Sequence, residues 1–393
     1  MLLSGPPAGG DWDRRAEALL AAAAGASMAT GARLGELRRS MAAAEMDALV
    51  VSNLTNVRYL CGFSGSAGLL VVTPDQAVLI TDGRYGLQAP AEIEAAGAEV
   101  EVQVPSTAAG QMSALAALIG SAGSAGLEAE HASWAFERRL AAALSESSSV
   151  QLVPAKTLVE EIRVTKDDGE LVRMAAAAAV ADAALARMLD RLQPGRSTEA
   201  DFALGLDTEM RRLGAQRVAF ETIVAAGMNG AKPHHQPSSK VIEAGELVVI
   251  DFGATVDGYR SDMTRTICAG DPASETLAEI AAVVATSQAA GVAAVGVGSD
   301  AKDVDAACRT IISQAGFGEA FVHSTGHGVG LDVHESPAVA QRCSAKLKDR
   351  SVVTVEPGIY LEGLGGCRIE DTVVVTPSGA VPLTGAPKQL VLA

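Results

Sequence analysis

The segment that decides the fold runs from Leu247 to Ile267 and reads LVVIDFGATVDGYRSDMTRTI. Two runs rich in β-branched residues flank Asp257-Gly258, a dipeptide that is a strong signal for a two-residue hairpin turn. Such a turn pairs Val256 with Tyr259, and this pairing sets the register of the two strands.

That register brings two carboxylates to one face of the hairpin. It sets Asp251 opposite Thr264 and Gly253 opposite Asp262. Because side chains alternate along a strand, Asp251 and Asp262 become diagonal neighbours, about 7 to 8 Å apart at the backbone. An anionic pair at the end of an apolar strand is costly unless a cation neutralises it. The alternative is a solvated hairpin with Asp251 at the end of its strand.

A second group of candidate residues is rich in histidine and glycine. It runs from His323 to Glu335 and reads HSTGHGVGLDVHE. His323 and His327 have the spacing of a helical zinc pair, but three glycines between 326 and 330 disfavour a helix. The glycines also miss the dinucleotide-binding pattern. They instead indicate backbone that passes close to a metal centre or a substrate.

Two more acids, Glu356 and Glu370, stand in apolar, strand-like runs near the C-terminus. Together with Asp251, Asp262 and His327 they would offer four carboxylates and one imidazole. An oxygen-rich set of this kind suits a pair of Mn²⁺, Co²⁺, Fe²⁺ or Zn²⁺ ions, and the chemistry that it predicts is activation of water.

Composition limits the classes of partner. The 393 residues include 31 Lys and Arg against 47 Asp and Glu, so the net charge of −16 repels polyanions, and neither nucleic acid nor a membrane is an expected partner. No transmembrane helix is predicted, because charges interrupt the alanine-rich runs. Five cysteines without a CxxC pair indicate reduced thiols in a cytoplasmic protein. The run from Gly62 to Ser66 lacks the nucleophile-elbow pattern of serine hydrolases.

Changes in composition divide the chain into an N-terminal extension (1–31), an α/β domain (32–158) and a larger domain (159–393). The smaller domain is expected to have a mixed sheet. Its strands are expected at 47–52, 69–73, 77–81 and 126–130, and its helices at 32–46, 89–96, 108–120 and 134–145. In the larger domain, helices are expected at 170–191, after a cap at Ser197 or Thr198, at 274–292 and at 301–315.

These motifs resemble the M24 metallopeptidases, whose catalytic domain has the pita-bread (creatinase/aminopeptidase) fold. The resemblance implies an α+β protein in which that domain follows a smaller α/β creatinase-type N-terminal domain. It also implies five ligands for two divalent metal ions, with Mn most expected and Co, Zn or Fe as alternatives. Asp262 and Glu370 would bridge both ions, Asp251 would chelate one, and His327 with Glu356 would hold the other. A bridging hydroxide would be the nucleophile, with Glu356 as the first acceptor of its proton.

The first half of the chain also resembles this family. The runs NVRYL (56–60), GFSGSAG (62–68) and TDGRY (81–85) are similar to the creatinase-type N-terminal domain. Methionine aminopeptidases lack that domain, and creatinase lacks the full ligand set. The combination therefore implies the proline-directed peptidases.

Within that group, further residues carry implied roles in catalysis and substrate binding. His234 resembles the histidine that contacts the scissile carbonyl or its tetrahedral intermediate, and it is preferred to its neighbour His235. His334 and His323 resemble histidines of the proline pocket. His334 is also counted as catalytic, as is Arg368, which resembles an arginine that orients the substrate.

The expected function is therefore that of an Xaa-Pro aminopeptidase acting on proline-containing peptides, as a cytoplasmic homodimer. The alternative is an Xaa-Pro dipeptidase (prolidase), and the motifs do not decide between the two. By resemblance, the FSGS run at 63–66 slightly favours the aminopeptidase. A catalytically inactive pita-bread binding module is less expected, because such proteins typically lose ligands and all five are present here.

Overall fold

The computed structural model describes residues 11–144, 149–388 and 391–392. Residues 1–10 of the expected extension and residue 145 of an expected helix lie outside this range. Two compact units make up the chain: one is Ser27–Arg163, and the other joins the described residues up to Ala26 with those from Val164 onward.

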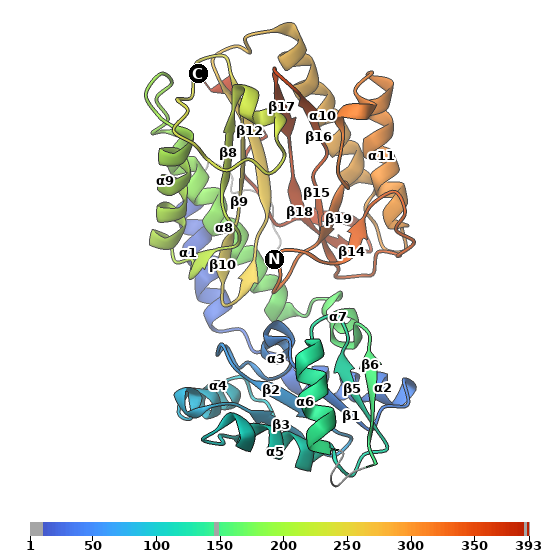
Figure 1. Cartoon of the computed structure of the whole chain (residues 1–393). Coiled ribbons are helices and arrows are strands. Elements are labelled where there is room, and N and C mark those ends of the chain that lie inside the picture. The colour runs from blue at the N-terminus through green and yellow to red at the C-terminus, as the bar shows by residue number, and fades with distance from the viewer. Residues whose placement is uncertain (1–10, 145–148, 389–390, 393) are drawn as a thin grey trace. The chain divides into compact units, whose positions relative to one another are not determined.

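The smaller unit is an α/β domain built on one mixed sheet, whose strand order is β4-β3-β2-β1-β5-β6 (Figure 1). β1 pairs antiparallel with β2 and parallel with β5, which confirms the expected mixed sheet. The predicted strands and helices of this unit are present, with small differences at their ends. Its elements are α2 (Thr30–Ala43), β1 (Ala48–Val51), α3 (Leu54–Cys61), β2 (Leu69–Val72), β3 (Ala77–Ile80), η1 (Gly83–Tyr85), α4 (Gln88–Ala95), β4 (Glu101–Gln103), α5 (Ala108–Ile119), β5 (Ser124–Glu128), α6 (Trp134–Leu144), β6 (Gln151–Ala155) and α7 (Leu158–Arg163).

The larger unit places its strands between two groups of helices, α1, α8 and α9 on one side and α10 and α11 on the other (Figure 1). Its two main sheets have the orders β20-β12-β9-β8 and β14-β13-β15-β18-β19. Its elements are α1 (Trp12–Ala24), α8 (Asp168–Leu189), α9 (Glu199–Arg212), β7 (Arg217–Val218), β8 (Ile223–Ala226), η2 (Gly227–Ala231), β9 (Leu247–Phe252), β10 (Ala254–Val256), β11 (Tyr259–Arg260), β12 (Met263–Ala269), α10 (Glu275–Ala294), α11 (Ala301–Gln314), η3 (Gly318–Ala320), β13 (Gly326–Gly328), β14 (Glu335–Val339), β15 (Val352–Val355), β16 (Gly358–Leu361), β17 (Gly365–Arg368), β18 (Asp371–Thr376), β19 (Gly379–Pro382) and β20 (Val391–Leu392).

The predicted hairpin and its register are confirmed. Val256 pairs with Tyr259 across the turn, and Asp251 pairs with Thr264 farther along. The ladder breaks at Gly253, where an added Cβ would lie 2.0 Å from the backbone oxygen of Ser261. Glycine is required there because the two strands approach too closely for a side chain.

Helix α1 belongs with the larger unit, although the sequence division set residues 1–31 apart. It packs along the alanine-rich α8, whose small side chains allow close approach. Arg15 of α1 donates to the buried Asp182 of α8 at 2.9 Å. Asp182 also accepts from the backbone nitrogens of Gly385 and Ala386 and so ties α1 and α8 to the C-terminal segment. The division by sequence began the larger domain at residue 159, whereas the whole of α7, which was not predicted as a helix, belongs to the smaller unit.

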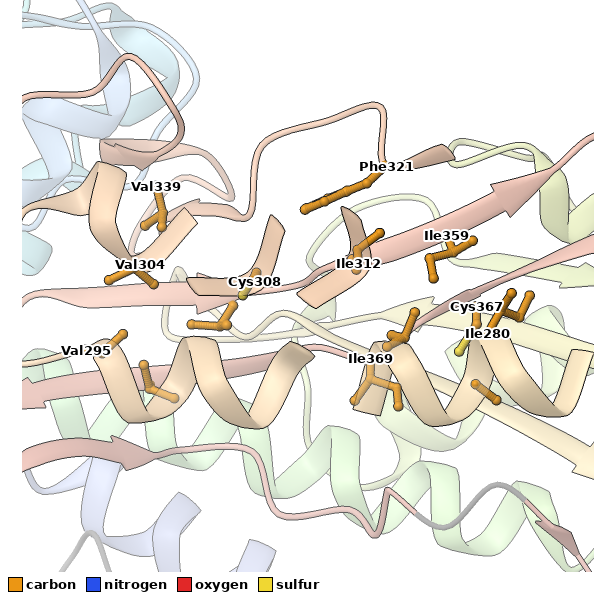
Figure 2. Close-up of a cluster of buried hydrophobic side chains, with 14 of the residues drawn as sticks. Ile280, Val295, Val304, Cys308, Ile312, Phe321, Val339, Ile359, Cys367 and Ile369 are labelled. Atoms are coloured by element: carbon orange, nitrogen blue, oxygen red, sulfur yellow. The ribbon is translucent and has the colours of Figure 1, made fainter. Parts of the chain in front are cut away.

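The main apolar core of the larger unit lies between α10, α11 and the adjoining strands. Figure 2 shows Ile280, Cys308 and Ile369 among the side chains that meet there. Among the described residues, α10 alone has the length and apolar composition that a membrane span requires. Its Leu277, Ile280 and Val284 are buried in this core, and a core helix passes the same test of length and composition.

A buried glutamate joins α9 to α8. Thr198, one of the two predicted caps, begins α9 by accepting from the nitrogen of Asp201. Near the other end of α9, Glu209 is 2% exposed and accepts hydrogen bonds from three arginines. These are Arg187 and Arg191 of α8 and the neighbouring Arg212. These three bonds lower the pKa of Glu209 to about 2, and the bond from Arg191 contributes most to this shift.

We predict that Glu209→Gln lowers the free energy of unfolding at pH 7 by roughly 2 kcal/mol, allowing for screening around the exposed arginines. A lowered pKa stabilises the folded state above the ordinary value of 4.5, and this stability disappears as the pH falls toward 2. The difference between wild type and variant should therefore narrow across that interval. Urea denaturation followed by circular dichroism measures this difference in the free energy of unfolding at each pH. A difference that does not change with pH would contradict the lowered pKa of Glu209.

Candidate metal centre

One pocket of about 490 Å³ in the larger unit gathers every site residue predicted from the sequence. The residues that line it include Asp251, Asp262, His327, Glu356, Glu370, His234, His323, His334 and Arg368. They are far apart in the sequence, and the strands of the larger unit and the loops between them bring them together.

The four acids stand at the ends of strands. Asp251 is near the end of β9, and Asp262 immediately precedes β12 in the same sheet. Glu356 immediately follows β15, and Glu370 immediately precedes β18 in the other main sheet. The strand backbones hydrogen-bond to their neighbours, so the carboxylates extend from fixed positions into one space.

His327 lies among these acids on β13, in a strand rather than a helix, as its flanking glycines indicated. One ligand atom each from Asp262, His327 and Glu370 lies within 4.8 Å of the others. His327 Nε2 is 3.7 Å from Asp262 Oδ2 and 3.4 Å from Glu356 Oε1. Both separations exceed a normal hydrogen bond and suit atoms that share a cation.

The acids oppose one another's ionisation. Burial raises the pKa of Asp262 and of Glu370 well above their ordinary values, and the nearby carboxylates raise them further. Burial also raises the pKa of Glu356 to about 8, although Arg368 opposes this shift. Without a cation, the cluster at pH 7 must therefore retain protons.

Asp251 supplies an independent test of whether these residues fit a metal ion. Its Oδ2 accepts a hydrogen bond from Arg368 Nη2 at 2.7 Å. Its Oδ1 is buried and, among the described residues, has no hydrogen-bond partner. Buried carboxylate oxygens are rarely left in this state, so an oxygen in the acidic pocket is available to a metal ion.

The imidazole of His327 is in the form that binds metals. Its Nδ1 lies 3.0 Å from the carbonyl oxygen of Gly328, which can only accept, so Nδ1 carries the proton. The lone pair of Nε2 therefore faces the acids. Burial lowers the pKa of His327 to about 4, which keeps the ring neutral at pH 7.

Two threonines that the sequence analysis did not identify orient the glutamates. Thr264 donates to Glu370 Oε2 at 2.8 Å and accepts from Arg368 Nε at 3.0 Å. Thr354 donates to Glu356 Oε1 at 3.3 Å. Thr264 had a sequence signal, because the predicted hairpin register places it opposite Asp251.

On another side of the pocket, Tyr360 joins His323 to Arg368. The hydroxyl of Tyr360 accepts from Arg368 Nη1 at 2.7 Å and lies 2.8 Å from His323 Nε2. His323 Nδ1 lies 2.7 Å from the carbonyl oxygen of Ser324, so the proton is on Nδ1 and Nε2 accepts from the tyrosine. Burial lowers the pKa of His323 to about 4. Tyr360 had no signal in the sequence that set it apart from other strand residues.

The remaining histidines have different surroundings. The ring of His334 lies against that of His327, with centroids 4.3 Å apart. His234 and His235 both border the pocket, but His235 Nε2 lies 2.9 Å from a carboxylate oxygen of Glu199. His234 has no such partner among the described residues, so its imidazole is available to a substrate.

Comparison with known proteins gives a consistent relationship over most of the chain. Residues 172–377 match metallopeptidase family M24, and residues 33–165 match the creatinase/prolidase N-terminal domain. The chain is 40% identical to the Bacillus subtilis protein named Uncharacterized peptidase YqhT, over 92% of this chain and 99% of that protein. The expected resemblance and the expected order of domains are confirmed.

Solved structures agree. An Xaa-Pro dipeptidase from Bacillus anthracis is 36% identical with a TM-score of 0.85, over 92% of this chain and 100% of that one. An X-Pro aminopeptidase from Thermotoga maritima is 34% identical with a TM-score of 0.81, over 90% of this chain and 100% of that one. The chain is therefore similar both to a structure named as a dipeptidase and to one named as an aminopeptidase.

We predict that Asp262→Asn leaves the metal-free protein at least as stable as wild type, because it removes one member of a repelling buried cluster. Added Mn²⁺ should raise the unfolding temperature of wild type by several degrees and that of the variant much less. Thermal unfolding of chelator-treated protein, with and without Mn²⁺, measures both effects. Glu209→Gln is the matched control, since it removes a buried acid outside the pocket and should keep the response to Mn²⁺. An equal response in Asp262→Asn and wild type would place the metal elsewhere.

Proposed function

The chain belongs to metallopeptidase family M24, and from this premise we propose that it is an Xaa-Pro aminopeptidase dependent on two divalent metal ions. It would hydrolyse the bond between an N-terminal residue and a following proline. The observation that carries the proposal is the pocket in which four carboxylates and one neutral imidazole converge beside His234, whose ring has no hydrogen-bond partner among the described residues.

In this proposal, Asp251, Asp262, His327, Glu356 and Glu370 hold the two ions, with Mn²⁺ the first candidate. Their oxygen-rich composition suits such metals. The buried Oδ1 of Asp251, which has no hydrogen-bond partner in the described parts of the chain, supports the assignment. Bound divalent ions would lower the pKa of a water molecule and polarise the scissile carbonyl.

Glu356 would have a second role besides metal binding, and the residues around the ligands would contact the substrate or position the groups that do. The Glu356 carboxylate would accept the proton of the attacking water, because it lies within the ligand cluster and faces the pocket. His234 and His334 would donate to oxygens of the substrate, including the one that gains charge during attack. Arg368 would hold Asp251 and Tyr360 in place beside them.

The pocket also suits proline. An Xaa-Pro bond has no N–H, so a site for it needs no hydrogen-bond acceptor at that nitrogen. Phe220, Ile223 and Val333 supply apolar lining against which a pyrrolidine ring can pack. His323, kept neutral by burial and bonded to Tyr360, would form a further side of this pocket.

The charges around the pocket favour peptides longer than two residues. A dipeptide would bring its terminal carboxylate next to the proline ring, where a cation would be needed to compensate it. Among the described lining residues, Arg368 is the sole arginine or lysine, and its guanidinium already donates to Asp251, Tyr360 and Thr264. A longer peptide presents an uncharged amide at that place. The competing function is that of an Xaa-Pro dipeptidase, the activity in the name of the Bacillus anthracis relative.

The proposal includes a cytoplasmic homodimer. Four of the five cysteines are buried and all five are free thiols, which supports a reducing compartment. Static light scattering of the purified protein tests the dimer directly.

We predict metal-dependent hydrolysis of an Xaa-Pro-Yaa tripeptide, with kcat/KM at least about tenfold above that for the matched Xaa-Pro dipeptide. The assay uses chelator-treated protein with and without Mn²⁺, Co²⁺ or Zn²⁺. A tripeptide with alanine in place of proline is the control and should be cleaved poorly. Cleavage of the dipeptide alone would replace the proposal by the dipeptidase function, and no cleavage of either by metal-loaded protein would refute both.

A further inference from the structure

A carboxylate that does not line the pocket holds the loop that carries His234. Glu199, the first residue of α9, is fully buried, and its two oxygens accept hydrogen bonds from donors spread along residues 226–238. The donors are Ala226 N at 2.8 Å, Asn229 Nδ2 at 3.0 Å, His235 Nε2 at 2.9 Å, Ser238 N at 3.0 Å and Ser238 Oγ at 2.6 Å. One side chain therefore fixes the loop at its beginning, its middle and its end.

Glu199 acts in this loop as an anion. Burial alone would raise its pKa, but the hydrogen bonds from Ser238, Ala226 and other donors outweigh this effect and lower the pKa. An ionised carboxylate only accepts, so Nε2 of His235 carries the proton. Bonds to an ionised acceptor are stronger than bonds between neutral groups, so the bonds to Glu199 hold the loop firmly.

The other side of the loop lies against the strand that carries Arg368. An added Cβ at Gly366 of β17 would come within 2.1 Å of the carbonyl oxygen of Gly230. Arg368 Nη1 donates to the carbonyl oxygen of Pro233 at 3.3 Å. His234 thus lies between Asn229 and His235, which both donate to Glu199, and the preceding Pro233 accepts from Arg368 of β17.

We infer that Glu199 is a positioning residue, which holds His234 in the pocket through its bonds to His235 and to the surrounding loop. The inference rests on the function proposed above. Among the described residues, Glu199 makes no hydrogen bond to a metal ligand, and we expect its main effect on hydrolysis through the placement of His234, which lies between the points that it holds. Reactions of this kind are sensitive to displacements of about 1 Å, which can cost roughly a hundredfold in rate.

A double-mutant cycle on Xaa-Pro-Yaa hydrolysis tests the inference. Glu199→Gln should lower kcat about 10- to 100-fold without loss of bound Mn²⁺. In a His234→Ala background the same substitution should lower kcat less than about twofold, because the group that it positions is gone. Equal losses in the two backgrounds would overturn the inference. Glu209→Gln is the matched control, a buried glutamate on the same helix with no bond to the loop, and it should leave kcat unchanged.

Substitutions of His235 provide a second test if Glu199→Gln does not fold. His235→Gln keeps an N–H near the position of Nε2 and should retain most of the activity. His235→Leu removes the donor and should reproduce the loss in kcat predicted for Glu199→Gln. Equal activity in the two His235 variants would contradict the proposed role.

A spectroscopic measurement separates this inference from the proposed function. In histidine-labelled protein, the imidazole resonances of His234, assigned by their loss in His234→Ala, should shift or broaden in Glu199→Gln and not in Glu209→Gln. This comparison holds even if no Xaa-Pro peptide is cleaved. Unchanged His234 resonances in folded Glu199→Gln would refute the positioning role whatever the substrate.

Discussion

The mutual repulsion of four carboxylates gathered in one pocket, two of them buried and two partly buried, is the constraint on which the rest of this site depends. Asp251, Asp262, Glu356 and Glu370 cannot all ionise away from water unless positive charge compensates them. Arg368 supplies one such charge through its 2.7 Å bond to Asp251. In the metal-free protein the raised pKa values of the remaining acids favour their protonated forms, and metal ions would compensate their charge in the loaded one.

The fold maintains this unfavourable arrangement with rigid elements. Each acid stands at the end of a paired strand, so its backbone cannot move to relieve the repulsion. Thr264 and Thr354 hold the two glutamates, and the carbonyl of Gly328 fixes the proton of His327 on the nitrogen that faces away from the acids. A site prepared in this way loses little free energy to reorganisation when a cation binds.

Much of this arrangement could be predicted because its signals are local in the sequence. The Asp257-Gly258 turn sets a register that places Asp251 opposite Thr264, as the structure has it. Tyr360 could not be predicted, since its bond to Arg368 depends on the pairing of β16 with β17 and its bond to His323 on a loop 37 residues away in the sequence. Helix α7 was missed because the charges of its run, LVEEIR, hide the buried Val159 and Ile162.

The most direct test of the account is the number of protons released when Mn²⁺ binds at pH 7. Calorimetric titrations in buffers of different ionisation enthalpy measure this number together with the stoichiometry. Because burial and repulsion raise the pKa values of Asp262, Glu356 and Glu370, we expect about two ions per chain and the release of at least one proton. Binding without proton release, or no binding, would contradict the claim that this cluster exchanges protons for metal.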